Sequence, residues 1–558
     1  ATSPVELLEP RRLLQGAVES PTKNNLGDLS LAAQFAKMAA EVTSSLATPT
    51  GGAVQAGATE GGITVGSVVN ISQRSGNESE ADIAVNPTNP DQIFVASNIS
   101  SGTGLFFASS SNAGATWTTR IGATGADIPS ACCDARVEYD NFGNLWLTYL
   151  GPGGANNYVA RSTNNGASFT IVDTKTGSWD NPAITVSHPI GGNQIIGIEA
   201  RGPGGVNGYQ GVSTGLGAPI TFTAAQTVPT TSSTGNFGDI AILNDGSALI
   251  TYTTPSGGQG PSTDPVYRDP DGIGTGVGWQ LVLTQATNVG GFDFFPAQSG
   301  RSVDSEPAFA VAPPGTPFAG RVYFTYLDEK VNENNDTDVM LRYSDDGGVT
   351  WSTPIIVNDD ATQNSQFLQQ IAVDRVTGAV VLSWHDARND NGVLPNGTNT
   401  AANDDAQFYG AVSLDGGVTF ENFQITSGWS NDNRAANGID YGDWTGSDIY
   451  NGVMYAVWAD NSQGAGGIPN NPTPNNFDLA TARVEIAVAT VPGVYGTVFD
   501  DANANAARDG GEGGLAGVTV YLDLDNSGTL NGSEPSVVTP GSGAYAFENL
   551  SAGTYTVR

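Results

Sequence analysis

Ser344-Asp345-Asp346-Gly347-Gly348-Val349-Thr350-Trp351 is the stretch from which the fold can be inferred. It places serine, aspartate, glycine, threonine and an aromatic residue at a fixed spacing, and residues 413–420 repeat that spacing. In such a turn the short carboxylate accepts hydrogen bonds from its own loop, glycine permits the tight turn, and the aromatic ring packs beneath the hairpin. The pattern therefore predicts a structural turn that does no chemistry.

Two weaker copies of this turn carry asparagine in place of aspartate. The residues of the four turns are Ser110, Asn112, Gly114 and Trp117; Ser162, Asn164, Gly166 and Phe169; Ser344, Asp346, Gly348 and Trp351; and Ser413, Asp415, Gly417 and Phe420. Two β-rich runs precede each turn, as in Ala135–Asp140 and Leu145–Tyr149. A repeat of roughly fifty residues is typical of stacked or radial repeat folds.

The number of blades follows from the second β-rich run, which occurs seven times between residues 93 and 458. Seven copies predict seven four-stranded blades around a channel. Six blades remain an alternative, because residues 438–490 lack a recognisable turn motif. The segment Ile63–Ser72 has no blade of its own and is expected to complete the last blade, which removes exposed strand edges.

These four turns, known as Asp-boxes, make residues 66–490 resemble the sialidase and BNR-repeat superfamily. The resemblance implies a β-propeller, here assigned to residues 62–490, with ligands bound on the face opposite the Asp-boxes. It implies little about activity, because the same repeat occurs in hydrolases, lectin-like binders and inert scaffolds.

A working sialidase would need three arginines, a tyrosine activated by glutamate, and an aspartic acid. The sequence offers fragments, which are Arg74, Arg136, Glu199, Arg201 and Tyr441, but lacks the family's Arg-Ile-Pro signature before the first Asp-box. No catalytic residue is therefore assigned, and enzymatic activity is not expected. A glycoside hydrolase with paired carboxylates stays open as an alternative.

The C-terminal tail, residues 491–558, has a different pattern that begins at Val494-Tyr495-Gly496-Thr497 and continues through Gly514-Leu515-Ala516-Gly517. It resembles the calcium-binding B-type repeats of bacterial surface adhesins, which implies a small β-sandwich, used in tandem as a stalk. One further strand would be expected after Arg558, so the repeat is interpreted as truncated.

Two twelve-residue loops in this tail have the spacing of an EF-hand, in which short oxygen side chains surround a hard cation. The first loop contains Asp501, Asn503, Asn505, Ala507, Asp509 and Glu512, and the second contains Asp523, Asp525, Ser527, Thr529, Asn531 and Glu534. Ala507 and Thr529 would supply carbonyl oxygens. Since the tail has no His or Cys, Ca²⁺ is the predicted ion and Zn²⁺ is not.

Residues 1–61 differ from the rest of the chain. Val5-Glu6-Leu7-Leu8-Glu9-Pro10-Arg11-Arg12-Leu13-Leu14 resembles the Leu-Glu-Pro-Arg leader motif of large exported bacterial proteins, which implies secretion or a cell-surface location. A helix is expected over roughly residues 29–46, with an apolar stripe that includes Phe35 and Met38. This segment could dock on a neighbouring molecule.

Composition excludes several partners. The chain has 21 Lys and Arg against 56 Asp and Glu, a formal net charge of -35 that disfavours nucleic acid and anionic membranes. No run of 18 apolar residues could span a membrane. Cys132 and Cys133 are adjacent, so they form either a vicinal disulfide or a pair of reduced, buried thiols, the latter being the default expectation.

Three functions fit these observations. The first is a non-catalytic cell-surface structural or adhesion protein, in which the propeller binds a protein or glycan and a calcium-stiffened repeat holds it. The second is a secreted sialidase-like glycoside hydrolase. The third is a subunit of a surface layer or extracellular fibre, which would make the protein a homo-oligomer.

Overall fold

The computed structural model describes residues 59–60, 62–100, 103–229, 235–274, 276–393, 401–435, 440–463, 466–473, 475–488, 494–500, 514–532, 534–539, 543–547, 550 and 554–558. The predicted export motif and helix, and the first predicted calcium loop, lie outside these residues. Within them the helices are two short 3-10 turns, η1 (Pro152–Gly154) and η2 (Asp432–Arg434), and none is long and apolar enough to cross a membrane.

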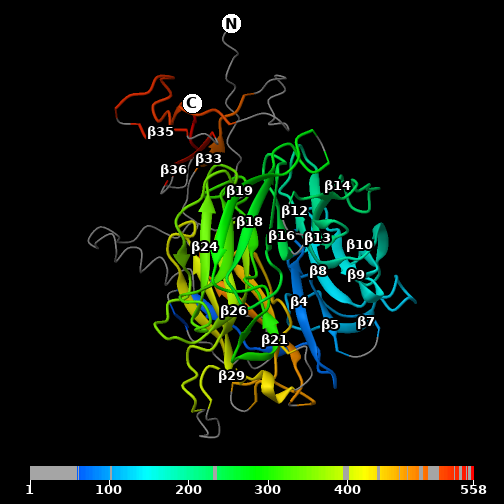
Figure 1. Ribbon diagram of the computed structural model, residues 1–558. Coiled ribbons are helices and arrows are strands. Elements are labelled where there is room, and N and C mark those ends of the chain that lie inside the picture. The colour runs from blue at the N-terminus through cyan, green and yellow to red at the C-terminus, as the bar shows by residue number, and fades with distance from the viewer. Residues whose placement is uncertain are drawn as a thin grey trace.

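Seven antiparallel sheets surround a central channel, so the protein is an all-β, seven-bladed propeller (Figure 1). Each blade has four successive strands from the channel outward. Blade 1 contains β4 (Glu78–Val85), β5 (Ile93–Ile99), β6 (Leu105–Ser110) and β7 (Thr118–Gly122). Blade 2 contains β8 (Cys133–Tyr139), β9 (Leu145–Leu150), β10 (Asn156–Ser162) and β11 (Thr170–Thr176). Blade 3 contains β12 (Asp180–Val186), β13 (Gln194–Gly202), β14 (Gly205–Ser213) and β15 (Gln226–Thr227).

The remaining blades follow in chain order. Blade 4 contains β16 (Asn236–Ile242), β17 (Ala248–Thr253), β18 (Ser262–Asp269) and β19 (Gln280–Thr287). A hairpin, β20 (Asp293–Phe295) and β21 (Gln298–Val303), precedes blade 5, which contains β22 (Ala308–Val311), β23 (Val322–Glu329), β24 (Thr337–Ser344) and β25 (Ile355–Ile356). Blade 6 contains β26 (Gln366–Val373), β27 (Val380–Asp386), β28 (Ala406–Ser413) and β29 (Glu421–Ser430).

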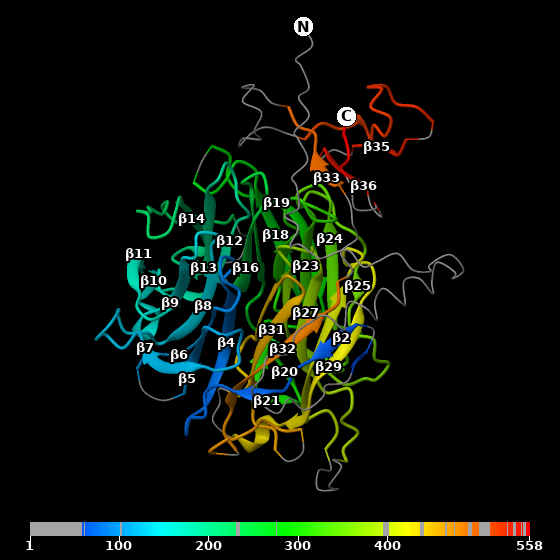
Figure 2. The ribbon, with the colours of Figure 1, turned by 180° about the vertical axis from the view of Figure 1, so that it is seen from behind.

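Blade 7 closes the ring with strands from both ends of the propeller. Its inner strands are β30 (Gly446–Tyr450), β31 (Val453–Asp460) and β32 (Asp478–Ile486). The segments β2 (Ile63–Val65) and β3 (Val69–Asn70) pair antiparallel with β32, and β1 (Thr59–Glu60) pairs with β2. Figure 2 shows β2 beside β32. The predictions of seven blades and of closure by the segment near residue 63 are confirmed, and the six-blade alternative is excluded.

The hydrophobic core lies between neighbouring blades. The second strands are buried on both faces, and β9, with the sequence Leu-Trp-Leu-Thr-Tyr-Leu, is buried at every position. A strand covered on both sides is expected to be a continuous apolar run, which is what these segments are. One core cluster joins Phe94 and Phe107 of blade 1 to Tyr139 and Leu147 of blade 2.

Three aspartates tie the inner strands of adjacent blades together along the channel. The second carboxylate oxygen of Asp82 accepts from Val137 N at 2.8 Å, that of Asp239 from Phe309 N at 2.7 Å, and that of Asp448 from Val85 N at 2.7 Å. We call these the axial aspartates. Backbone N–H groups that face the channel without a strand partner are thereby satisfied.

The C-terminal segment forms a separate small β unit. Here β33 (Val494–Thr497) pairs with β36 (Ala544–Phe547), and β34 (Thr519–Tyr521) pairs with β35 (Ser536–Val538). Val498, Val520, Leu522 and Phe547 form its core. This is a much smaller core than that of the propeller, so additional stabilisation by a bound ion would matter here.

The axial aspartates give a first prediction. Asp239→Ala leaves the Phe309 N–H without its acceptor and should reduce the free energy of unfolding by about 1–3 kcal/mol. Asp239→Asn retains one acceptor oxygen and should reduce it less. The midpoint of urea denaturation measures both, with exposed Asp91→Ala as a control. Equal midpoints for Asp239→Ala and Asp91→Ala would contradict the bridging role.

Candidate functional site

The four Ser-x-Asx-x-Gly turns have one common hydrogen-bond pattern. In each, the serine Oγ accepts from the glycine N–H, as in Gly348 N to Ser344 at 2.8 Å, and donates to the Asx side chain. The Asx Oδ1 accepts from the backbone N–H four residues on, at 2.8 Å in Asp346 and 2.9 Å in Asn112. The carboxylate therefore organises its own loop.

Exchange of aspartate for asparagine reverses one bond in these turns. Thr350 Oγ1 donates to Asp346 at 2.6 Å, whereas Asn112 Nδ2 donates to Thr116 Oγ1 at 2.9 Å. Each turn joins the third and fourth strands of blades 1, 2, 5 and 6. Trp117, Phe169, Trp351 and Phe420 pack against core clusters. These contacts hold each turn together and pack it against its blade.

The second predicted calcium loop brings three carboxylates together. Asp523, Asp525 and Glu534 each offer an oxygen within 4.8 Å of the others. Ca²⁺ takes oxygen ligands at roughly 2.3–2.6 Å, so two oxygens on opposite sides of one ion are about twice that distance apart. The spacing of these three carboxylates is compatible with such an ion. Ser527 Oγ lies 3.1 Å from the carbonyl oxygen of Thr529, which places these two predicted ligands side by side.

The backbone of this loop is already shaped by its carboxylates. Ser527 N and Gly528 N donate to Asp523 at 2.9 Å, and Leu524 N and Asn531 N donate to Glu534 at 3.0 and 2.9 Å. The Arg558 guanidinium also contacts Asp523 at 2.6 Å. Gly528 has φ 74, the left-handed conformation that a sharp turn requires at this position. The residues present fit a calcium ion.

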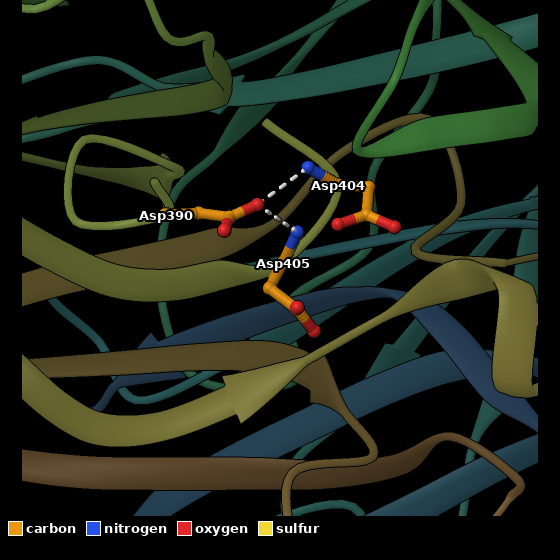
Figure 3. A group of neighbouring side chains, drawn as sticks. All are labelled: Asp390, Asp404 and Asp405. Atoms are coloured by element: carbon orange, nitrogen blue, oxygen red, sulfur yellow. Dashed lines mark hydrogen bonds between the residues drawn. The ribbon is translucent and has the colours of Figure 1, made fainter. Parts of the chain in front are cut away.

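A second acidic trio, Asp390, Asp404 and Asp405, also has oxygens within 4.8 Å of one another. Figure 3 shows that one Asp390 oxygen accepts the backbone N–H groups of Asp404 and Asp405, at 2.8 and 3.1 Å, while the carboxylates of those two residues point away from it. Asp405 in turn accepts from Asn431 at 3.1 Å and Arg434 at 3.3 Å. The hydrogen bonds of Asp390 and Asp405 therefore stabilise the described part of the loop between β27 and β28.

Six of the inner strands share a backbone feature near their first residues. A residue with positive φ stands at the start of six of them: Glu80, Asp134, Asn181, Phe237, Glu306 and Leu368. A register irregularity accompanies it in β4, β8, β12, β16 and β26. Such bulges redirect one side chain, and they cluster next to functional sites. These six residues define the channel mouth.

The mouth and the four turns lie on opposite faces. The third strand of a blade runs parallel to the first, so the turn that follows it lies at the far end from residues such as Glu80. The long loops after the second strands, residues 330–336, 387–405 and 461–477, lie on the mouth side. This is the face on which the sequence resemblance placed ligands.

Arg301 is the most heavily paired cation of the mouth. It is carried there by β21 and contacts Asp443 through two nitrogens, at 2.6 and 2.5 Å, and Glu80 at 2.8 Å. The Asn98 amide donates to Glu80, and Asn98 Oδ1 accepts Asp134 N at 2.8 Å. These contacts join blades 1, 2 and 7 through a single network.

Arg136 comes from β8 and lines the channel beside the mouth. Its guanidinium stacks on the buried ring of Trp444 at 4.0 Å, and its buried Nε has no hydrogen-bond partner. Its charge acts on six carboxyl groups, which are Glu80, Asp82, Glu199, Asp239, Asp304 and Glu306. A guanidinium on an aromatic face is stabilised by the ring quadrupole.

Glu199 is a buried carboxyl group with an orphan oxygen. It comes from β13, is 1% exposed, and its Oε2 has no partner. A Cβ at Gly238 would lie 3.2 Å from its Cδ, and Gly238 lines the channel. The absence of a side chain at residue 238 therefore makes the space that the Glu199 carboxyl group occupies.

Burial dominates the titration of these groups. It raises the pKa of Asp134 to about 7, and Asp180 and Asp443 add to the increase. Burial also raises the pKa of Asp82 and Asp239 to about 6, and those of Glu80, Glu199, Asp304 and Glu306 well above the ordinary value, while Arg136 partly offsets each shift. Carboxyl groups with pKa near 7 can donate or accept a proton at neutral pH.

The channel below the mouth is a polar cavity of about 160 Å³. Asp82, Glu138, Asp239 and Asp448 line it together with Arg136 and Arg375. His188 lies further along, contacts Val311 O at 3.0 Å, and has its pKa lowered by burial to about 4. At roughly 30 Å³ per molecule, the cavity has room for about five waters or an equal number of hydroxyl groups.

Cys132 and Cys133 are joined in a vicinal disulfide at the start of β8, directly before Asp134 of the mouth. Both are half-buried against Leu150 and Trp179. The structure thus has the disulfide, and not the reduced pair of the default expectation. A disulfide between neighbours restricts the backbone that leads into Asp134.

Of the sialidase-like fragments, Arg136 lines the channel and acts on the buried Glu199, and Arg201 lies opposite Asp180 in the strand register of blade 3. Arg74 pairs with Glu78 at 2.9 Å, and Tyr441 is buried against His385 and Phe477. The sequence analysis missed Glu80, Asp134, Glu306, Arg301 and Asp443. Three of these could have been found, since Glu80, Asp134 and Glu306 each stand one residue before a predicted inner run.

Comparison with known proteins identifies one segment. Residues 494–558 match the SdrD B-like domain family. No curated protein is similar to the chain at a significant level.

Solved structures similar to the chain include the GH93 alpha-L-arabinofuranosidase of Fusarium graminearum with arabinobiose (12% identity, 62% of this chain and 98% of that chain, TM-score 0.37). The Hadza microbial sialidase Hz136 is 12% identical over 72% of this chain and 75% of that chain, with a TM-score of 0.36. Trypanosoma rangeli sialidase in complex with sialic acid is 11% identical over 78% of this chain and 60% of that chain, with a TM-score of 0.35. Similarity at this level says nothing about activity.

The raised pKa values predict that the propeller loses stability as the pH rises. Each carboxyl with a folded pKa near 6–7 binds a proton in the folded state but not in the unfolded state between about pH 4.5 and 7. His188 and His385, whose pKa values are lowered to about 4 and about 3, act in the opposite direction but are fewer.

The melting temperature of the propeller, measured in chelator by tryptophan fluorescence, should therefore fall between pH 5.5 and 7.5. Asp134→Asn should make this dependence shallower, because the amide is neutral throughout. A melting temperature that rises over this interval would show that the mouth carboxyls are not protonated in the folded protein.

Proposed function

We propose that this chain is an extracellular, cell-surface binding protein: the propeller mouth binds a ligand, and the C-terminal repeat is a calcium-stiffened spacer. The observation that carries the proposal is the convergence of Asp523, Asp525 and Glu534 within the segment that matches the SdrD B-like domain. That family belongs to bacterial surface adhesins, which supports a surface location and a structural role for the repeat.

The topology supports this arrangement. β32 runs parallel to β30, so the chain leaves the propeller at Ile486, at the end opposite the mouth. The repeat is therefore attached behind the binding face, and Figures 1 and 2 both show β33–β36 at the end of the propeller away from β21. A spacer in this position leaves the mouth accessible to a protein or glycan. A formal charge of -35 makes nucleic acid an unsuitable partner.

Calcium binding is tested by calorimetric titration of the whole chain, together with thermal melts in chelator and in millimolar Ca²⁺. The transition of the repeat should rise with calcium, because an ion bound only to the folded state adds about 2.7 kcal/mol at a hundredfold excess over Kd. Asp523→Asn with Glu534→Gln should remove one binding equivalent. Asp91→Asn, which removes an exposed propeller charge, is the control.

Absence of both binding heat and a thermal shift in the unmutated chain would overturn the calcium proposal. Retention of full stoichiometry in the double variant would show that the ion binds elsewhere.

Glycoside hydrolysis is a second candidate function. The observation that favours it is that Asp134 and Glu199, two carboxyl groups with raised pKa, both interact electrostatically with Asp180 at the start of blade 3. Glycosidases commonly use one protonated and one ionised carboxyl group. Turnover of nitrophenyl glycosides by the purified chain, lost in Asp134→Asn and in Glu199→Gln, would establish this function. No turnover across a broad panel of glycosides would favour the binding protein.

Assembly into a surface layer or fibre stays a prediction, because the segment that would mediate it lies outside the described residues.

A further inference from the structure

Blade 4 differs from the other blades at the last residue of its third strand. In blades 1, 2, 3, 5 and 6 this residue is a serine whose hydroxyl group forms hydrogen bonds; these residues are Ser110, Ser162, Ser213, Ser344 and Ser413. In blade 4 the residue is Asp269, at the end of β18. A carboxyl group therefore stands where the other five blades have a hydroxyl group.

The turn that follows β18 brings two carboxyl groups together. In blade 5, Ser344 Oγ donates to the carboxylate of Asp346 at 2.8 Å. Asp271 has the position of Asp346 in blade 4, and it accepts from Val277 N at 3.0 Å, so it organises its own loop as the other turns do. An ionised Asp269 has no proton to donate to it. Two negative charges therefore meet where other blades have a hydrogen bond, which is unfavourable unless a proton or a cation lies between them.

Asp269 is buried, and both of its carboxyl oxygens lack a hydrogen-bond partner. Its exposed fraction is 0%, and neither Oδ1 nor Oδ2 accepts from a donor in the described part of the chain. The serines at the five equivalent positions all have partners, so this deficit is specific to blade 4. A buried carboxylate without donors is unfavourable, and a bound cation would remove that penalty.

The side chains around Asp269 do not pair its charge. Burial raises the pKa of Asp269 to about 6, and the Asp271 carboxyl group adds to the increase. The Asp271 N–H and the Gln226 amide lower this pKa, although neither reaches hydrogen-bonding geometry. The adjacent guanidinium, that of Arg268, donates to Gly347 O at 3.0 Å. Since successive side chains of a strand point to opposite faces, Arg268 points away from Asp269.

Two neutral oxygens from outside the turn lie beside it. A Cβ at Gly272 would lie 3.2 Å from Gly246 O and 3.4 Å from Gln210 Nε2. Gln210, on β14 of blade 3, has a buried Oε1 without a donor among the described residues. Gly272 has φ 88, so this position requires glycine, and the missing side chain leaves the space open. Acceptor groups from blades 3 and 4 therefore lie around the same turn.

One donor of this segment, Trp279 Nε1, also lacks a partner. Its ring packs on Gly208 and Ile273 in the core between blades 3 and 4. The ring therefore belongs to the apolar core.

The chemistry of these oxygens fits calcium. Ca²⁺ takes roughly 6–8 oxygen ligands from carboxylate, amide and carbonyl groups and from water. The turn and its neighbours offer the first three kinds, and a shallow pocket lined by Gln226, Gly274 and Gly276 opens beside them to solvent. Zn²⁺ would need His or Cys, which residues 269–279 do not contain.

We propose that the turn after β18 binds a calcium ion within the propeller, with carboxylate oxygens from Asp269 and Asp271 and neutral oxygens from Gln210 and Gly246. Because Gln210 belongs to blade 3, the ion joins two blades. This site is separate from the predicted calcium loops of the C-terminal repeat, and it does not rest on the proposed function.

Tryptophan fluorescence tests the site because it reports on the propeller alone: all nine tryptophans lie between residues 117 and 458. Thermal melts of the whole chain at neutral pH are followed by this signal, in chelator and in millimolar Ca²⁺. The propeller transition should rise by about 2–5 °C with calcium, since an ion bound only to the folded state stabilises it. An identical transition in both solutions would overturn the site, whatever the repeat does.

The variants use residues that other blades already have at these positions. Asp269→Ser should weaken calcium binding by the propeller at least about tenfold and abolish the thermal shift, without lowering the melting temperature in chelator. Asp271→Asn, which matches Asn112 and Asn164 of blades 1 and 2, is the second variant and should also weaken binding. Asp346→Asn makes the same change in blade 5, and it should leave the calcium shift intact.

Tb³⁺ measures the affinity of the site directly. It replaces Ca²⁺ in oxygen sites and luminesces when a nearby tryptophan is excited, and residues 491–558 contain no tryptophan. Luminescence excited through tryptophan should be displaced by Ca²⁺ in the unmutated chain and should be lost in Asp269→Ser.

A proton shared by Asp269 and Asp271 is the competing explanation. In that case calcium would not shift the propeller transition, and Asp269→Ser would only flatten the pH dependence of the melting temperature; this result would overturn the site. A full calcium shift in both Asp269→Ser and Asp271→Asn would also overturn it, by placing the ion elsewhere in the propeller. Loss of calcium binding by the repeat alone, with the propeller shift retained, would count against the proposed spacer and support this site.

Discussion

A propeller exists only when its first and last strands meet, and here that meeting depends on the pairing of Ile63–Val65 with Val484–Ile486. Without it, blade 7 would have a bare outer edge, and an unpaired edge invites association with other chains. Closure also fixes the circumference, and with it the distance across the channel. The inner strands are then held close enough for the three axial aspartates to reach the backbone of the neighbouring blade.

The same closure accounts for the unusual chemistry of the mouth. Bringing the starts of the inner strands to one point concentrates Glu80, Asp134 and Glu306 in a partly dehydrated space. Water cannot solvate them fully, so protons are retained where an exposed carboxyl group would lose them. Arg301 links the strands through its ion pairs, whereas Arg136 is held over Trp444. The charge of Arg136 lowers the pKa values of six surrounding carboxyl groups. The rigidity of the mouth and its uneven distribution of charge therefore both follow from closure of the propeller.

Much of the fold could be predicted because its signals are local. Ser344, Asp346 and Gly348 bond within one turn, and the apolar runs of the second strands are complete within single strands. The convergence of Asp523, Asp525 and Glu534 was predictable for the same reason, since these residues lie within one twelve-residue loop. The mouth was not, because Glu80 and Arg301 are 221 positions apart in the chain. Sequence spacing carries no information about which blades face each other across a channel. The oxidation state of Cys132 and Cys133 could not be predicted for a different reason, because two adjacent cysteines can be either oxidised or reduced.

The arrangement of the two chain exits has a mechanical consequence. Gly62 and Ala487 lie side by side, joined by a hydrogen bond of 2.8 Å from Ala487 N to Gly62 O, where the chain enters and leaves the propeller. Tension between the two flanking segments would pass across this point and would not travel round the ring. Since both ends leave the same side of the β2–β32 pair, its hydrogen bonds would be loaded one after another and not all together. The pair would open like a zipper at low force, and the other six blades would carry almost none of the load.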